Sequence, residues 1–114
     1  MIYSLYAQVG KVIQFFEEKK WSKRNSRPKR PFPGHTLYHF YISPFSMRAR
    51  KAVYELGLDI PFIDILSDSN ANEILVSQGG KDQVPCLRIE TKDGVRWMYE
   101  SQDIIAYLKK QTQF

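Results

Sequence analysis

The sequence from Thr36 to Gly57 reads TLYHFYISPFSMRARKAVYELG. Its first seven residues, up to Ile42, are mostly aromatic or β-branched, which is typical of a strand. Ser43 and Pro44 predict a helix start, because a serine hydroxyl caps free N–H groups and proline lacks the N–H that a first turn leaves unpaired. Gly57 suits a left-handed helix end. This stretch therefore predicts a strand that runs directly into a helix.

Further elements follow this strand–helix unit. We expect the first helix to bury Met47, Ala52, Val53 and Leu56. The later elements are a strand Pro61–Leu66, a helix from Asp68 or Ser69 to about Ser77, strands Val84–Thr91 and Val95–Glu100, and a last helix capped by Ser101. The turn at residues 92–94 predicts a hairpin, whereas strands joined through a helix should be parallel. The predicted fold class is α/β, a mixed four-stranded sheet with flanking helices.

The N-terminal third differs in composition from this predicted domain at residues 36–114. Residues 1–21 predict an amphipathic helix, because apolar residues recur at helical spacing. These residues are Ile2, Leu5, Tyr6, Val9, Val12, Ile13 and Phe16. Residues 22–35 are rich in proline and basic residues, which is typical of a linker. Residues 1–30 hold eight Lys/Arg and two Glu, so the basic charge of the chain belongs to this segment.

Several partners suit such an N-terminal segment. A helix with Trp21 beside a basic cluster is typical of peripheral attachment to a membrane surface through residues 1–30. Packing on the domain, on a second copy in a homodimer or on another protein is the alternative, and disorder is a third. The segment has no apolar run long enough to span a bilayer. We expect no nucleic-acid partner and a cytoplasmic protein, peripheral on the inner face of a membrane if the helix binds lipid.

The histidines and the single cysteine predict neither a disulfide nor a metal site. Cys86 has no partner for an intramolecular disulfide, and we interpret it as a buried structural residue. One thiol with His35 and His39 cannot complete a structural zinc site. We expect both histidines to be ordinary surface or strand residues.

Three short motifs accompany this order of elements. They are SPFS at Ser43–Ser46, QVPCL at Gln83–Leu87 and YESQD at Tyr99–Asp103. Together they resemble glutaredoxins and the N-terminal domain of glutathione transferases, which are members of the thioredoxin-fold superfamily. The resemblance covers about residues 36–110 and implies a thioredoxin-like fold.

The resemblance also implies a glutathione site, with glutathione as ligand or co-substrate and no metal. Pro85 corresponds to the cis-proline of the superfamily, and Val84 to the residue whose backbone pairs with the cysteinyl part of glutathione. Glu100 and Ser101 correspond to the pair that grips the γ-glutamyl group. Gln83, with Lys81 nearby, would lie toward the glycyl end.

Ser43 and Ser46 stand where glutaredoxins carry their two cysteines. A hydroxyl cannot form a mixed disulfide, so dithiol redox chemistry is excluded at these positions. The resemblance makes Ser43 the candidate to hydrogen-bond the thiolate of glutathione, as in serine-type transferases, and Ser46 a weaker candidate. An ordinary dithiol protein with both cysteines replaced by serine would give the same sequence.

The sequence leaves the activity open. If the protein is an enzyme, the resemblance implies a glutathione transferase-like activity that uses a serine hydroxyl. Transferases of this kind also use a second, helical domain, which we do not find in this sequence. The alternatives are a non-enzymatic module that binds a protein in the groove of the fold, and a membrane-surface adaptor.

Overall fold

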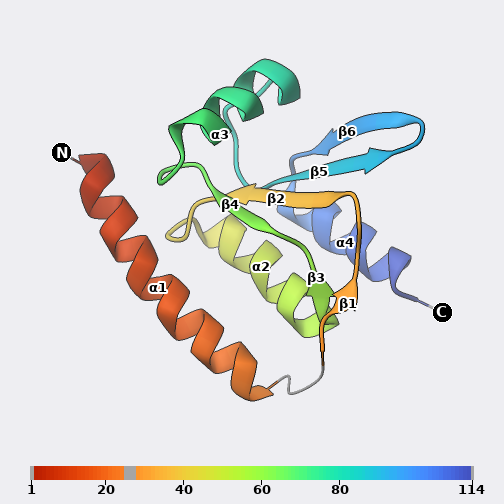
Figure 1. Ribbon diagram of the computed structural model, residues 1–114, viewed down its shortest axis with the longest axis horizontal. Helices are drawn as coiled ribbons and strands as arrows, with labels where there is room; N and C mark the ends of the chain where they lie inside the picture. Colours follow the sequence, from red (N-terminus) through yellow and green to blue (C-terminus); the bar gives the residue numbers. More distant parts are fainter. Residues whose placement is uncertain (1, 25–27, 114) are drawn as a thin grey trace.

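The computed structural model of the protein describes residues 2–24 and 28–113, with side chains from Leu5 onward. Figure 1 shows a long N-terminal helix beside a sheet that carries helices on both faces. The elements are α1 (Ile2–Arg24), β1 (Arg30–Pro31), β2 (His35–His39), α2 (Pro44–Leu56), β3 (Leu58–Asp59), β4 (Phe62–Asp64), α3 (Ser69–Ile74), the π-helical turn η1 (Leu75–Gly79), β5 (Cys86–Thr91), β6 (Gly94–Met98) and α4 (Ser101–Gln111).

The main sheet has the strand order β4-β2-β5-β6. β2 runs parallel to β4, to which it is joined through α2, and antiparallel to β5, and β5 and β6 form an antiparallel hairpin. This arrangement confirms the predicted mixed, thioredoxin-like sheet with flanking helices. A small parallel pair, β1 with β3, lies outside the main sheet.

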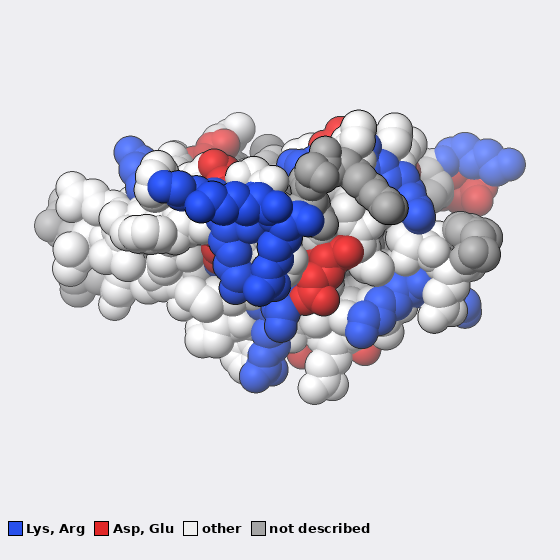
Figure 2. Space-filling view, turned by 90° about the horizontal axis from the view of Figure 1, so that it is seen from below, with Lys and Arg blue, Asp and Glu red and all other residues white. Residues whose placement is uncertain are grey.

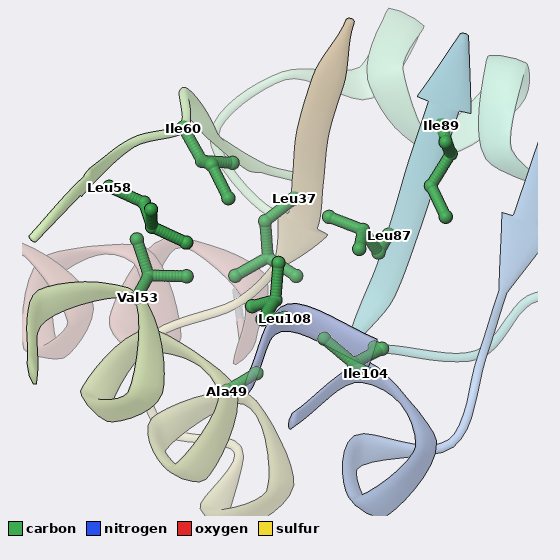
Figure 3. Packing of buried hydrophobic residues seen from close by; sticks show 9 residues of the cluster. All are labelled: Leu37, Ala49, Val53, Leu58, Ile60, Leu87, Ile89, Ile104 and Leu108. Atoms are coloured by element: carbon green, nitrogen blue, oxygen red, sulfur yellow. The ribbon is translucent and has the colours of Figure 1, made fainter. Parts of the chain in front are cut away.

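The two faces of the sheet bury different residues, because successive side chains of a strand point to opposite faces. On one face, sheet residues such as Leu37, Leu87 and Ile89 meet α2 and α4, as Figure 3 shows. The buried cluster on this face comprises Leu37, Ala49, Val53, Leu58, Ile60, Leu87, Ile89, Ile104 and Leu108. On the other face, Tyr38 and Cys86 pack with residues of α3 and η1.

The start and end of α2 confirm the prediction from the quoted stretch. Ser43 is the N-cap, and its hydroxyl oxygen accepts a hydrogen bond from the Ser46 N–H at 3.3 Å. Gly57 closes the helix with φ at 65°, in the left-handed region that favours glycine. The predicted buried stripe was partly wrong, because Met47 is exposed whereas Arg50 is buried.

Several element boundaries differ from the prediction. α1 continues past residue 21 to Arg24, and the expected linker contains β1, while residues 25–27 of that linker lie outside the described residues. β2 ends at His39 instead of Ile42, since residues 40–43 form the turn into α2. Ser101 is the first residue of α4, and Glu100 occupies the N-cap position that we expected for Ser101.

The long helix α1 packs on the domain through one face. The Trp21 ring stacks on the Tyr54 ring with centroids 5.5 Å apart. Glu17 forms an ion pair with the buried Arg50, with 2.7 Å between Oε2 and Nη2. Gly10 is buried in α1 and lies next to Tyr41.

The predicted apolar stripe is not the packing face of α1. Among the stripe residues whose side chains are described, Ile13 is half-buried and the other five are exposed. These five are Leu5, Tyr6, Val9, Val12 and Phe16. None of the described helices is long and apolar enough to cross a bilayer.

Candidate functional site

The three sequence motifs meet at one edge of the main sheet. Tyr38, near the end of β2, pairs with Cys86 at the start of β5, and Leu87 pairs with Met98 at the end of β6. The segment after β2 leads to Ser43, the segment before β5 holds residues 83–85, and the segment after β6 leads into α4. Antiparallel pairing thus brings the three candidate segments to the same edge.

At the first segment, the two serines lie in the first turn of α2. Ser43 is largely buried, and its oxygen accepts the Ser46 N–H, so its own O–H remains able to donate to another acceptor. Ser46 is fully buried, and its hydroxyl has no hydrogen-bond partner among the described residues. A buried hydroxyl without a partner is costly, whereas a thiol, which is a weak donor, fits such a position at less cost.

The loop before β5 connects the second segment to the third. The Val84–Pro85 peptide bond is cis, Pro85 is fully buried and Val84 is half-buried. The Gln83 amide Nε2 donates to Glu100 Oε1 at 3.4 Å. The structure therefore brings two exposed polar side chains that sequence analysis singled out, Gln83 and Glu100, into contact.

The third segment ends at the N-terminus of α4. The first turn of a helix leaves backbone N–H groups unpaired and carries the positive end of the helix dipole. Ser101 is largely buried at this end, and Glu100 at the N-cap is exposed and makes no side-chain capping bond. The end of α4 thus offers N–H groups, a hydroxyl and the exposed Glu100 carboxylate, which together suit an amino-acid head group with both charges.

Sequence reasoning did not assign Tyr99 to the site. Its hydroxyl accepts a hydrogen bond from the Lys81 backbone N–H at 3.3 Å, and it also forms a hydrogen bond with the Cys86 thiol. A side chain at Gly79 would collide with this hydroxyl, so glycine is needed where η1 ends. The sequence signal that could have identified Tyr99 was its position directly before Glu100. The role of Tyr99 is to fix the loop at residues 79–86 against β6.

Cys86 is a structural residue, as the sequence predicted. It is buried at the start of β5, and burial raises the pKa of its thiol to about 12, although hydrogen bonds from Tyr99 and from the Met98 backbone oppose that rise. A thiol with such a pKa stays protonated at neutral pH and is therefore a poor nucleophile. Within residues 2–24 and 28–113, no three His, Cys, Asp or Glu side chains gather in a way that would hold a metal ion.

A buried cation shapes the turn that carries Ser43. Arg50 donates to the backbone oxygens of Phe40 and Tyr41, at 3.4 and 2.9 Å, and its Nη1 lies 3.0 Å from His39 Nδ1. Burial, and then the charge of Arg50, lower the pKa of His39 to about 3, so this histidine is neutral. His39 is a strand histidine, as we expected, but it is fully buried and belongs to the network that holds residues 40–43.

Two hollows lie away from this edge. One, of about 600 Å³, is bounded by α1, α2 and residues 57–62, and aromatic rings such as Trp21 and Phe62 line it. The other, of about 480 Å³, is bounded by residues 31–36 and their neighbours. Neither is lined by Ser43, Val84 or Ser101, so the candidate site is distinct from both.

Known structures share this fold. A crystal structure of maleylacetoacetate isomerase from Anaeromyxobacter dehalogenans 2CP-1, with bound dicarboxyethyl glutathione and citrate, superposes with a TM-score of 0.53 at 24% identity, over 68% of this chain and 36% of that chain. A second structure of this isomerase, with bound GSH, gives a TM-score of 0.54 at 20% identity, over 68% and 37%. This chain therefore spans little more than a third of either.

A search of curated proteins finds no match to this chain. The family model described as glutathione S-transferase, N-terminal domain, matches residues 37–113. This match begins within β2 and ends after α4, so it covers nearly the whole main sheet and all three segments of the candidate site. Because it takes in well over half of the sequence, this chain belongs to the family of glutathione S-transferase N-terminal domains.

Proposed function

We propose that this domain binds glutathione at the sheet edge where the turn into α2, the loop before β5 and the N-terminus of α4 meet. The observation that carries the proposal is the strand register, which gathers the three motifs at one edge. The structural neighbours are supporting evidence, because both were crystallised with glutathione or a glutathione derivative.

Each charged end of glutathione has a counterpart at this edge. The Glu100 carboxylate binds the ammonium of the γ-glutamyl group, and the Ser101 hydroxyl and the N–H groups of α4 bind its carboxylate. The backbone of Val84, held by the buried Pro85, pairs with the cysteinyl unit. Gln83 turns from Glu100 toward the glycyl end, which its exposed position allows.

The serines set the chemistry at the thiol of the bound glutathione. The Ser43 O–H donates to the thiolate while its oxygen keeps the Ser46 N–H, and this bond favours the ionised thiol. Ser46 is fully buried, so it supports the turn without touching the ligand. With hydroxyls at both positions, disulfide exchange does not occur here. If the domain is part of an enzyme, the activity is transferase-like.

Titration calorimetry with reduced glutathione tests the binding site. We expect Ser101→Ala and Glu100→Gln each to weaken binding about tenfold, since hydrogen bonds to charged groups contribute about 1.5–3 kcal/mol. Glu90→Gln is the matched control, because Glu90 is an exposed carboxylate on β5 away from this edge. Absence of heat at millimolar glutathione, with unchanged amide signals of Val84 and Ser101, would refute the proposal.

A test of the role of Ser43 must compare two ligands, because Ser43→Ala also removes a helix cap and could weaken binding for that reason alone. We expect this variant to weaken binding of glutathione about fivefold at pH 8.5 and to leave binding of S-methylglutathione, which has no thiolate, unchanged. Equal losses for both ligands would show that Ser43 only caps α2.

A further inference from the structure

The outward face of α1 is apolar, although the helix is already packed on the domain. Leu5 and Phe16 are 60% and 63% exposed, and Val9, Val12 and Phe15 are also exposed. In most helices of folded domains the apolar stripe faces the core. Here the contacts with the domain use Gly10, Glu17 and Trp21 instead.

The helical geometry places these two sets on opposite sides. At 100° per residue, Gly10, Glu17 and Trp21 fall within about 40° of one another, and the arc centred on Val12 and Phe16 lies on the far side. Continuing along α1, the outward arc carries Lys19, Lys20 and Lys23 in place of apolar residues, and all three are exposed. The outward face, defined by Leu5, Val9, Val12, Phe15, Phe16, Lys19, Lys20 and Lys23, is therefore mostly apolar first, with the exposed Gln8 within the same arc, and basic toward its end.

The charge of this face has one sign. None of its eight residues is acidic, since Glu17 turns inward to Arg50 and Glu18 lies on the flank, where Gln14 donates to it. Figure 2, seen from the side on which α1 ends, shows a large group of Lys and Arg side chains, with mostly uncharged surface extending to the left toward the start of α1. Carboxylates and further Lys and Arg side chains lie to the right of this group.

We propose that α1 docks this domain on an anionic lipid surface, lying in the plane of the bilayer interface with its outward face toward the lipid. The apolar side chains enter the boundary between head groups and acyl chains, and the lysines reach lipid phosphates at the level of the head groups. The inner face of α1 keeps its contacts with α2 and with Tyr41, so docking requires no unfolding of the domain.

A second copy of the chain fits this face less well. In a symmetric dimer the same face would meet itself, and it brings lysines but no carboxylate to pair with them. Burying unpaired ammonium groups is costly. A lipid surface supplies negative charge to all three lysines at once, and their contribution falls with added salt.

Co-sedimentation with vesicles tests this proposal on the full chain. We expect binding to vesicles of 70% phosphatidylcholine and 30% phosphatidylglycerol, and at least tenfold weaker binding to pure phosphatidylcholine vesicles. Replacing Lys19, Lys20 and Lys23 together by glutamine should weaken binding about a hundredfold at low salt. The reason is that each lysine contributes roughly one contact with an anionic head group, and all three contacts are lost. The matched control replaces the exposed Lys92, Lys109 and Lys110, which lie away from α1, and should bind normally.

The apolar part of the face is tested by Val12→Asp against Val95→Asp. Both valines are exposed to a similar extent, at 55% and 44%, but Val95 lies on β6. Only Val12→Asp should reduce vesicle binding, by tenfold or more. Absence of vesicle binding by the unmodified chain, or equal effects of the two variants, would overturn the proposal. A dimer in sedimentation that Val12→Asp converts to a monomer, without vesicle binding, would assign the face to a second copy instead.

Discussion

The helices α1 and α4 place their apolar residues in opposite ways. α4 turns Ile104 and Leu108 into the core between the sheet and α2, and both are fully buried. α1 meets the same domain through a glycine, a glutamate and one tryptophan, and leaves leucine, valine and phenylalanine side chains at its surface. α4 is held by the hydrophobic effect, whereas the described contacts of α1 include a stacked ring and an ion pair.

The difference shows that an amphipathic pattern predicts a helix but not the direction of its apolar face. For α4, the apolar residues at helical spacing face the buried residues of β5, because both sets belong to one core. For α1, the face that packs contains few apolar residues, and its contacts form with residues 31 or more positions away, such as Tyr41 and Arg50. We expect α1 to contribute less to global stability than α4.

The largest expected effect on stability is the loss of a buried leucine in α4, compared with an exposed leucine in α1. Leu108→Ala in α4 should lower the free energy of unfolding by about 3 kcal/mol, because it empties a fully buried site. Leu5→Ala in α1 should change it by less than about 0.5 kcal/mol, because Leu5 is exposed. Urea unfolding of the two variants checks this prediction, and similar losses would show that the outward face of α1 is covered in solution.

The next effect concerns the ion pair that holds α1. Glu17→Gln should cost about 2 kcal/mol, because Arg50 is fully buried and loses its carboxylate partner, while partial exposure of Glu17 moderates the loss. Glu18→Gln, at the exposed neighbouring position, should have almost no effect. Thermal unfolding of both variants is the measurement, and equal melting temperatures would mean that α1 is not anchored through Arg50.

The free energy of unfolding should depend on pH through His39, and this dependence should not involve the core residues of α4. The pKa of His39 is about 3 in the folded protein and 6.5 in the unfolded chain, so the unfolded chain binds a proton that the folded protein does not. Stability is therefore full above pH 6.5 and falls as pH drops toward 3, by about 2 kcal/mol at pH 5.

Comparison of pH 7.5 with pH 5 in urea unfolding checks this pH dependence. His39→Gln should be less stable than the unmodified protein at pH 7.5, because Arg50 loses the ring that faces it, and should lose less stability on acidification. Leu108→Ala, on the α4 side, should keep the full pH dependence. An unchanged pH dependence in His39→Gln would show that other groups cause it.

Much of the fold could be predicted from local patterns, and the exceptions have physical reasons. The order of strands and helices, the cap at Ser43 and the left-handed Gly57 depend on neighbouring residues. The two-residue pair of β1 with β3 and the contacts of the buried Arg50 with Glu17 and His39 depend on partners 11 to 33 positions apart. The sequence gives no sign that the fold will bury Arg50 beside these two partners.

The candidate site shows the same division between local and distant signals. SPFS, Val84-Pro85 and Glu100-Ser101 were found because each motif is contiguous, and the sheet register then brings the three together. Tyr99 was missed as a site residue because its hydroxyl acts on Lys81 and Cys86, across a loop whose course the sequence does not specify. The family resemblance supplied the roles of the motifs, whereas the contact between Gln83 and Glu100 came only from the structure.

The smallest effect gives the sharpest test of how α1 is oriented. In an exposed helix, Gly→Ala stabilises by about 1 kcal/mol. At Gly10 the added Cβ would lie 3.3 Å from the Tyr41 Cβ, and Tyr41 is buried with Arg50 at 4.6 Å over its ring, so it has little room to move. We therefore expect Gly10→Ala to be neutral or to destabilise by up to about 0.5 kcal/mol. Ala106→Gly, at an exposed position in α4, should show the ordinary cost of about 1 kcal/mol. If Gly10→Ala instead stabilises by the full amount, the Gly10 face of α1 is free in solution, and the two faces of the helix are not distinguished by packing.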